Sequence, residues 1–233
     1  MSVVYLMCGG GWLGSPTPKP LQDFGSGRPL LVDHYHQTEA SFDRVVCMVE
    51  RSHLAAFERV REEYSLEKIS MTQTADHSST ADKFSTILEQ AVDTSLLVSY
   101  PDIFAPPKFW GALPESRGHV GGLSVMKTPI TSRFPRVYGE MFSSSVKGVS
   151  DYRSPRPANP HFIFAGLMLV DVDPTRELWL EYAANQTIGS LEVGFLDYAA
   201  NHGALSAEAY YGDWFHIDSH RDYRLMSAVL VDV

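Results

Sequence analysis

A cluster of glycines followed by a lysine, close to the N-terminus, has the residue types and spacing needed to bind phosphate. The stretch is CGGGWLGSPTPKPL, residues 8–21, and it follows the apolar run VVYLM. Gly9, Gly11 and Gly14 have the spacing G-x-G-x-x-G, which in dinucleotide-binding proteins joins a strand to a helix. The backbone amides of such a loop can hold a phosphate group, and Lys19 can supply positive charge.

The prolines that follow Gly14 exclude part of this chemistry. The segment SPTPKP removes amide donors and favours extended backbone, so it disfavours the helix that a dinucleotide site requires. A Walker loop is excluded because the ending Gly-Lys-Ser/Thr is absent. Two interpretations of the loop remain open: a phosphate cradle that uses Lys19, or a structural turn whose lysine is solvated.

Composition restricts the partners of the chain. With 233 residues and 44% hydrophobic residues, it is long enough to bury a core, and we expect one domain over residues 1–233. A net charge of -9 argues against general binding of nucleic acid or of membrane surfaces. Cys8 and Cys47 lie in apolar runs and are interpreted as reduced core residues. No membrane span or signal peptide is recognised, so we expect a cytoplasmic protein.

The first half of the sequence alternates strand and helix patterns. Ser79 and Asp82 have the spacing of a capping box at the start of one of the helices. The predicted strands are residues 3–7, 44–50 and 95–101, and the predicted helices are residues 52–64 and 79–92. This order predicts an α/β fold whose central sheet is mostly parallel.

The second half starts with a different pattern. From residue 102 to residue 160 prolines, glycines and serines are frequent, and no helix separates the strand candidates 122–128 and 161–171, so we expect an irregular, partly antiparallel region. A helix is predicted over 189–203, a strand with a turn over 207–217, and a final helix over 219–230. Ser219 and Asp222 are predicted to form the capping box of the final helix.

Several motifs together resemble the sugar-1-phosphate nucleotidyltransferases. PKPL matches the family literally, and GRPLLVDH is similar to its Gly-Lys-Pro-Leu-Ile helix start. QTADHSSTADKF, SLLVSYPDIF, HFIFAGLMLVD and GDWFHIDSHRDYRLM resemble four further family segments and follow in the right order. The resemblance covers nearly the whole chain and implies the fold of that family, a three-layer Rossmann-like sandwich of the nucleotide-diphospho-sugar transferase type.

The resemblance also implies a reaction and its site. A sugar 1-phosphate or similar acceptor attacks the α-phosphorus of a nucleoside triphosphate, and pyrophosphate leaves. Asp102 and Asp218 would hold Mg²⁺, with Mn²⁺ as an alternative, and Lys19 would act with them in catalysis. The remaining implied residues are Gly9, Gly10, Gly11 and Gln73 for the nucleotide and Arg153, Arg156 and Gly166 for the acceptor.

Departures from the family pattern leave alternatives open. Trp12 and Leu13 stand where the glycine loop of the family carries an arginine, which supports a second hypothesis, a nucleotide- or sugar-binding regulatory protein with impaired catalysis. Either His216 or Asp218 could be the second metal ligand, because the metal aspartate of the family falls at one position in one branch and at the other in another. Histidine suits Mn²⁺ or Zn²⁺ better than Mg²⁺, which favours Asp218. A nucleotide-sugar glycosyltransferase is disfavoured because SYPDIF carries a single aspartate. Self-association into a homo-oligomer stays open, as does the identity of the base and of the acceptor.

Overall fold

The chain divides into two units in the computed structural model, which describes residues 3–9, 15–115, 122–129, 136–138, 144, 146–150, 162–185 and 190–230. The first unit is made of Met1–Ser78, Leu97–Gly111 and Gly212–Val233, and the second of Ser79–Leu96 and Ala112–Tyr211. The expectation of a single domain stays a prediction. Among the described residues, no helix combines the length and apolar character that a membrane crossing requires.

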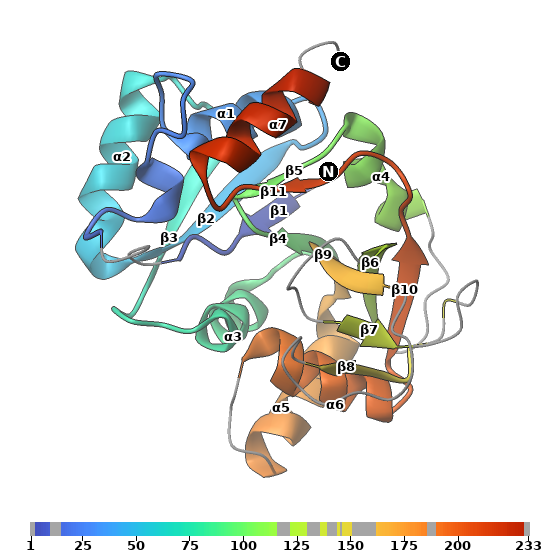
Figure 1. Cartoon of the computed structure of the whole chain (residues 1–233). Helices are drawn as coiled ribbons and strands as arrows, with labels where there is room; N and C mark the ends of the chain where they lie inside the picture. The colour runs from blue at the N-terminus through green and yellow to red at the C-terminus, as the bar shows by residue number, and fades with distance from the viewer. Residues whose placement is uncertain are drawn as a thin grey trace. The chain divides into compact units, whose positions relative to one another are not determined.

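The first unit is built on parallel strands. Its strands are β1 (Val3–Leu6), β2 (Arg44–Glu50), β3 (Ile69–Thr74) and the Leu97–Ser99 part of β4 (Ser95–Ser99), in the order β4-β1-β2-β3. In β2 the residues from Val45 to Glu50 are all buried, as expected for a parallel strand covered on both faces. Helices α1 (Leu30–Thr38) and α2 (Leu54–Glu63) connect these strands along the chain (Figure 1). Cys8 and Cys47 are buried thiols, as predicted.

A short antiparallel pair completes the first unit. Strand β5 (Ile103–Phe104) pairs with β11 (Phe215–His216), and helix α7 (His220–Leu230) follows directly. Helices α1 and α7 lie side by side (Figure 1), and the Tyr223 hydroxyl of α7 donates a 2.9 Å hydrogen bond to the Asp33 carboxylate of α1. A buried apolar cluster joins these elements; its members are Phe24, Leu30, Phe104, Ile217 and Met226.

The second unit contains the predicted antiparallel region. Strand β6 (Leu123–Pro129) pairs antiparallel with β9 (Phe162–Asp171) and parallel with β10 (Leu205–Ala209). Strand β7 (Arg136–Tyr138) pairs antiparallel with β8 (Gly148–Ser150) and with β9. The helices are α3 (Thr80–Gln90), α5 (Val172–Asn185) and α6 (Leu196–Asn201), and a π-helical turn, Leu191–Phe195, precedes α6. Helix α4 (Pro107–Glu115) begins in the first unit and ends in the second.

The two units together confirm the predicted fold class, an α/β fold with a mostly parallel sheet and flanking helices. Helices α4 and α5 are not among the predicted elements. The strand predicted over 207–217 is wrong in one respect, because β10 ends at Ala209 and β11 belongs to the other unit. The predicted helix 189–203 is present as the π-helical turn and α6.

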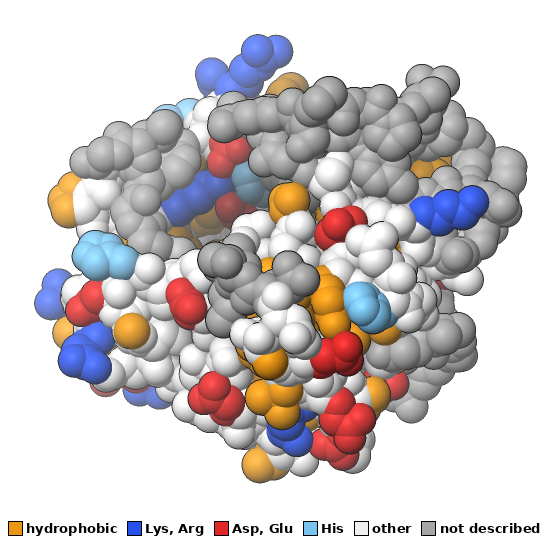
Figure 2. Space-filling model, turned by 90° about the horizontal axis from the view of Figure 1, so that it is seen from below, with side chains coloured by type: hydrophobic (Ala, Val, Ile, Leu, Met, Phe, Trp, Pro, Cys, Tyr) orange, Lys and Arg blue, Asp and Glu red, His pale blue; other side chains and the backbone are white. Residues whose placement is uncertain are grey.

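Figure 2 shows one face of the protein. On this face the lysine and arginine side chains of the described residues are scattered among acidic residues. This distribution agrees with the net charge of -9. On that face, the described residues therefore lack the basic patch that recognition of nucleic acid requires.

The predicted capping box at the start of α3 is confirmed. The Ser79 hydroxyl oxygen accepts a 3.1 Å hydrogen bond from the Asp82 amide, and the Asp82 carboxylate accepts the Ser79 amide at 2.8 Å. The Ser79 hydroxyl also donates a 2.7 Å hydrogen bond to the Asp82 carboxylate, and this bond, together with that from the Ser79 amide, holds the pKa of Asp82 below its ordinary value. Each of the two hydrogen bonds from an amide satisfies a group that the first turn of a helix cannot pair internally.

Replacing Ser79 with alanine is expected to lower the free energy of unfolding by about 1 kcal/mol, because one helix-terminal amide loses its partner. Urea unfolding followed by circular dichroism measures this change. Ser85→Ala is the matched control, since Ser85 lies in the same helix and its hydroxyl bonds to the Glu89 side chain rather than to the backbone. Equal losses in the two variants would contradict the role of the cap.

Candidate functional site

Four charged or titratable side chains of the first unit meet in one cluster. The Lys19 Nζ atom lies 2.7 Å from Asp102 Oδ2 and 2.6 Å from Asp218 Oδ1. The ring of His216 lies between the same two carboxylates, with Nε2 3.1 Å from Asp102 Oδ2 and Nδ1 3.1 Å from Asp218 Oδ2. The structure therefore brings together Lys19, Asp102 and Asp218, which the sequence singles out. His216 also belongs to the cluster, together with Asp218.

Strand pairing positions Asp102 beside His216. Strand β4 ends at Ser99, and the chain turns through Asp102 into β5, where Ile103 pairs with His216 of β11. The Ile217 amide donates a 2.9 Å hydrogen bond to the Asp102 carbonyl and extends this pairing by one step. Ile217 is fully buried, so its packing anchors the two polar residues on either side of it.

Local turns hold the other two members in place. At the predicted capping box of α7, the Ser219 hydroxyl accepts the Asp222 amide at 3.2 Å and donates to the Asp222 carboxylate at 2.7 Å, but that carboxylate accepts the Asp218 amide, at 3.1 Å, in place of the Ser219 amide. Lys19 lies between Pro18 and the buried Pro20, and it is the first residue of a one-turn 3₁₀ helix, Lys19–Leu21. The fixed φ of the two prolines restricts the backbone on both sides of the lysine. Each side chain of the cluster thus comes from a constrained backbone.

Opposite charges keep all members of the cluster ionised. Burial alone would raise the pKa of Asp102, but the adjacent His216 and Lys19 hold it well below its usual range. Burial alone would likewise raise the pKa of Asp218, but His216 and Lys19 hold it below its usual range. Burial alone would lower the pKa of His216, but the carboxylates of Asp102 and Asp218 raise it to about 9. At pH 7 two cations therefore face two carboxylates.

These shifts predict how the stability of the metal-free protein depends on pH. His216 has a pKa of about 9 in the folded protein and an ordinary pKa of 6.5, so its contribution to stability is complete below about pH 6.5 and is lost as the pH rises toward 9. The carboxylates of Asp102 and Asp218 stabilise the folded protein above about pH 4, and this stabilisation is lost as the pH falls. His216→Asn is expected to remove the alkaline decline, at most about 3 kcal/mol between pH 6.5 and 9.

Chemical denaturation at a series of pH values measures this dependence. His36→Asn is the matched control, because His36 lies on the exposed side of α1 with 43% of its side chain accessible. A decline between pH 6.5 and 9 that persists unchanged in His216→Asn would contradict the assignment.

The same cluster has the donor atoms of a metal site. Asp102, His216 and Asp218 each offer a ligand atom, and these atoms lie within 4.8 Å of one another. Among the described residues, Asp102 Oδ1 is buried with no hydrogen-bond partner, so one carboxylate oxygen remains available to a cation. Two carboxylates suit Mg²⁺ or Mn²⁺, and the imidazole shifts the preference of the set toward Mn²⁺. The residues present therefore fit a divalent cation.

A neutral histidine lies near this cluster. His34 of α1 is fully buried, and its ring packs edge-on against Phe104 and Trp110, with ring centroids 5.7 and 5.5 Å away. Burial lowers the pKa of His34 to about 4, although the negative charge of Asp102 acts in the opposite direction. His34 is therefore uncharged at pH 7 and does not compete with Lys19 or His216 for the carboxylates.

The predicted nucleotide-binding residues are only partly described. Gly9 directly precedes the undescribed residues 10–14, its backbone is exposed, and a Cβ atom there would meet nothing within 4 Å. Gly10 and Gly11 lie outside the described residues. Gln73 lies near the end of β3 with an exposed side chain, paired in register with Val49. The binding roles of these residues stay predictions.

Of the predicted acceptor-binding residues, only Gly166 is described, since Arg153 and Arg156 lie outside the described part of the chain. Gly166 is buried in β9 with a φ of 77°. The β6–β9 register shifts at this place, between Val125 and Lys127 on β6. A glycine with positive φ at such a shift is typical of a β-bulge. Gly166 therefore has a structural role here, and a role in acceptor binding stays a prediction.

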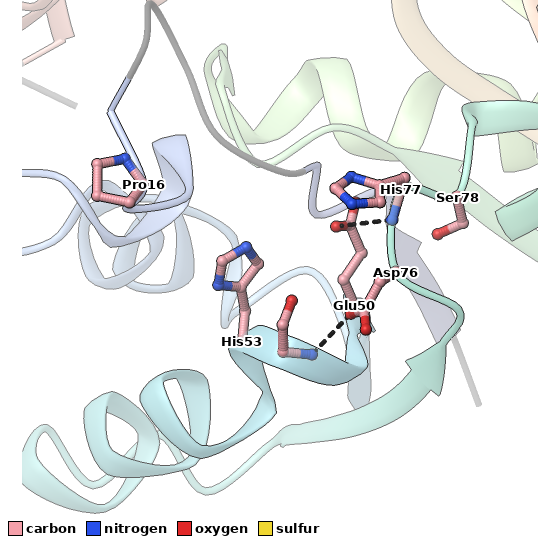
Figure 3. Close-up of a pocket in the computed structure, with 7 residues that line it drawn as sticks. Pro16, Glu50, His53, Asp76, His77 and Ser78 are labelled. Carbon is pink, nitrogen blue, oxygen red and sulfur yellow. Dashed lines mark hydrogen bonds between the residues drawn. The ribbon is translucent and has the colours of Figure 1, made fainter.

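A pocket lined mainly by polar and charged residues lies where β2 and β3 end, and three of these residues, Asp76, His77 and Ser78, belong to the QTADHSSTADKF segment. The pocket has a volume of about 700 Å³ (Figure 3), and it is lined by Pro16, Glu50, Ser52, His53, Asp76, His77 and Ser78. The Glu50 carboxylate accepts the His77 amide at 3.2 Å, and the Asp76 carboxylate accepts the Ser52 amide at 2.8 Å. A further signal in the sequence is the carboxylate of Glu50 at the end of an apolar strand run.

Comparison with solved structures identifies enzymes with this fold. A Bacillus anthracis protein described as a glucose-1-phosphate thymidylyltransferase, in complex with sucrose, has 14% identity and a TM-score of 0.74, covering 100% of this chain and 96% of the other. A UDP-glucose pyrophosphorylase complexed with UDP-glucose has 12% identity and a TM-score of 0.73, covering 100% and 99%. The inositol-1-phosphate CTP transferase of T. maritima has 16% identity and a TM-score of 0.73, covering 98% and 95%.

No family model and no curated protein matches the chain. Two of these neighbours are named as nucleotide transferases of glucose 1-phosphate and of inositol 1-phosphate, and the third is named as a UDP-glucose pyrophosphorylase. The chain shares their fold over its whole length, while its sequence is 12% to 16% identical to theirs.

Proposed function

We propose that this chain transfers a nucleoside monophosphate from a nucleoside triphosphate to a sugar 1-phosphate or a similar phosphorylated acceptor and releases pyrophosphate. The observation that carries the proposal is the cluster of Lys19, Asp102, His216 and Asp218 on the fold of the nucleotidyltransferases. In open α/β sheets ligands bind beyond the carboxyl ends of the strands, and Asp102 lies there, just after β4.

The proposed roles of the residues are metal binding and phosphate binding. Asp102 and Asp218, with His216, would hold the divalent cation, which neutralises phosphate charge when it is bound. Lys19 donates hydrogen bonds to phosphate oxygens, and the amides of Gly9, Gly10 and Gly11 add to them. A phosphate oxygen of the acceptor forms a bond to the α-phosphorus while the bond to the pyrophosphate oxygen breaks. The chain needs no covalent intermediate, because it contributes positioning and charge neutralisation.

The remaining predicted residues complete the substrate contacts. Gln73 would contact the base through its amide, since an amide both donates and accepts. Arg153, Arg156 and Gly166 are proposed to contact the phosphorylated acceptor, because a guanidinium group binds phosphate with two parallel hydrogen bonds. Mg²⁺ is the proposed cation, and Mn²⁺ is the alternative that the imidazole of His216 favours.

Pyrophosphate release tests this function. The protein is incubated with ATP, GTP, CTP, UTP or dTTP, with Mg²⁺ or Mn²⁺, and with a panel of sugar 1-phosphates and inositol 1-phosphate. We expect release with at least one pair of substrates, dependent on both the acceptor and the cation. Formation of the nucleotide-linked product, followed by chromatography, separates transfer from hydrolysis. Absence of release with every pair would contradict the proposal.

A second candidate function is nucleotide or sugar binding without transfer. It is favoured by the sequence CGGGWLGSPTPK, which lacks the arginine expected in the glycine loop of the resembled family. This function predicts that calorimetry detects cation-dependent binding of a triphosphate while no pyrophosphate is released. The two measurements on one preparation therefore separate the two candidates.

A further inference from the structure

The pocket at the ends of β2 and β3 lies within reach of the Lys19 cluster along the chain. Pro16 lines the pocket and Lys19 follows three residues later, so even an extended chain places their Cα atoms at most about 11 Å apart. A nucleoside in the pocket can therefore extend its phosphates toward Lys19. The volume of about 700 Å³ lies in the range of small-molecule sites, and a purine or a pyrimidine with its ribose fits it.

The chemistry of the pocket wall disfavours phosphate and favours hydrogen-bond donors. Two carboxylates, Glu50 and Asp76, line it, and none of the described lining residues is a lysine or an arginine. Figure 3 shows the hydrogen bonds that orient the two groups, from the His77 amide to Glu50 and from the Ser52 amide to Asp76. A carboxylate has about four acceptor positions, and the amide bond uses one of them in each group.

The loop that carries one side of the wall is held in an unusual conformation. His77 has a φ of 61°, a left-handed conformation that non-glycine residues seldom adopt. The Glu50 carboxylate stabilises it by accepting the His77 amide, and the Thr74 and Ser78 hydroxyl groups hydrogen-bond across the same loop at 2.9 Å. These bonds fix the position of the loop that carries Asp76 and His77.

We infer that this pocket takes the nucleobase of the triphosphate and that the carboxylates of Glu50 and Asp76, rather than the amide of Gln73, which does not line the pocket, select bases with an exocyclic amine. The inference rests on the function proposed above. Cytosine, adenine and guanine each present an amine that donates to a carboxylate, whereas uracil and thymine present carbonyl oxygens on both sides of one N–H. An anionic acceptor repels those carbonyl oxygens, so UTP and dTTP bind less tightly.

The fold by itself does not select the base. Among the structural neighbours, one is complexed with UDP-glucose and another is named as a CTP transferase, and both cover nearly the whole chain. The side chains at the ends of β2 and β3 of this chain must therefore make the distinction. Glu50 and Asp76 are the two described lining residues that are anionic acceptors.

Equilibrium binding of the five triphosphates to the full-length protein with Mn²⁺ tests the selectivity. We expect ATP, CTP or GTP to bind at least about tenfold tighter than UTP and dTTP, because only a base with an exocyclic amine donates a hydrogen bond from that amine to the charged acceptor. Cytidine and uridine, which carry no phosphate, test the location. Cytidine is expected to shift the imidazole resonances of His53 and His77 in the NMR spectrum, and uridine to shift them less.

Two isosteric variants and one control identify the residues responsible. Glu50→Gln and Asp76→Asn replace an acceptor oxygen by a donor amide, so each is expected to reduce the preference for amine-bearing bases to less than about threefold. Glu63→Gln, an exposed residue of α2 outside the pocket, removes the same charge and is expected to leave the preference unchanged. Thermal unfolding confirms that each variant is folded, and the Gln and Asn side chains keep an acceptor for the amides of His77 and Ser52.

The outcomes separate this inference from the proposed function. Tight cation-dependent binding that favours UTP or dTTP, or a preference that neither variant changes, overturns the inference and leaves the transferase function standing. Binding of no triphosphate, together with no pyrophosphate release, overturns both.

Discussion

Replacing Asp102 with asparagine is expected to abolish cation-dependent binding of nucleoside triphosphate and to lower the rate of pyrophosphate release about a thousandfold or more. The Asp102 carboxylate contacts both Lys19 and His216, at 2.7 and 3.1 Å, as the Asp218 carboxylate also does. The other oxygen of Asp102 is the buried acceptor without a hydrogen-bond partner among the described residues. Asparagine keeps the shape of the side chain but removes the charge that a divalent cation requires.

Direct measurement of cation binding separates a site effect from a folding effect. Titration with Mn²⁺, followed by electron paramagnetic resonance, is expected to show a site in the wild-type protein that Asp102→Asn lacks. Asp213→Asn is the matched control, because Asp213 is exposed in the segment that precedes β11. Unchanged Mn²⁺ affinity in Asp102→Asn would remove Asp102 from the metal site.

The Lys19→Met variant is expected to separate phosphate binding from metal binding. Loss of the ammonium group removes a charge-assisted donor to the phosphates, so turnover is expected to fall about 10²- to 10³-fold. Without a cation, Asp102 and Asp218 then face His216 alone, and the free energy of unfolding is expected to fall by about 1–3 kcal/mol. The two carboxylates of the cluster remain, so Mn²⁺ is expected to bind at least as tightly as in the wild-type protein.

Thermal unfolding with and without Mn²⁺ measures this difference. Mn²⁺ is expected to raise the melting temperature of Lys19→Met more than that of the wild-type protein, because the cation replaces the charge that was removed. Lys108→Met, which changes an exposed lysine in α4, serves as the control. Loss of Mn²⁺ binding in Lys19→Met would contradict the separate roles of Lys19 and the carboxylates.

Local signals in the sequence predict the elements that position the cluster. The capping box of Ser79 with Asp82 is complete, and Ser219 caps α7 by accepting the Asp222 amide, because these hydrogen bonds join residues three apart. Helix α5 carries a comparable signal that the predicted elements do not include. Its buried residues are Val172, Thr175, Trp179 and Tyr182, and their spacing follows one face of a helix.

Non-local contacts account for what the sequence does not predict. The sequence leaves His216 and Asp218 as alternative metal ligands, since the metal-binding aspartate of the resembled family falls at one position or at the other in different branches. Strand β11 ends at His216, and the turn into α7 directs the Asp218 carboxylate to the opposite nitrogen of the same ring, so both residues join the cluster. The pocket of Glu50 and Asp76 likewise depends on the pairing of β2 with β3, which lie apart in the sequence.

The sequence by itself determined the α/β fold with its mostly parallel sheet, the helix caps, and the residues Lys19, Asp102 and Asp218 as members of one site. These features depend on periodicity, on hydrogen bonds between near neighbours, and on motifs in a given order. Tertiary structure alone decided that His216 lies between the two carboxylates, that its pKa rises to about 9, and that an acidic pocket lies at the ends of β2 and β3. Charge interactions depend on distances of a few ångströms between residues far apart in the chain, and only the folded packing sets those distances.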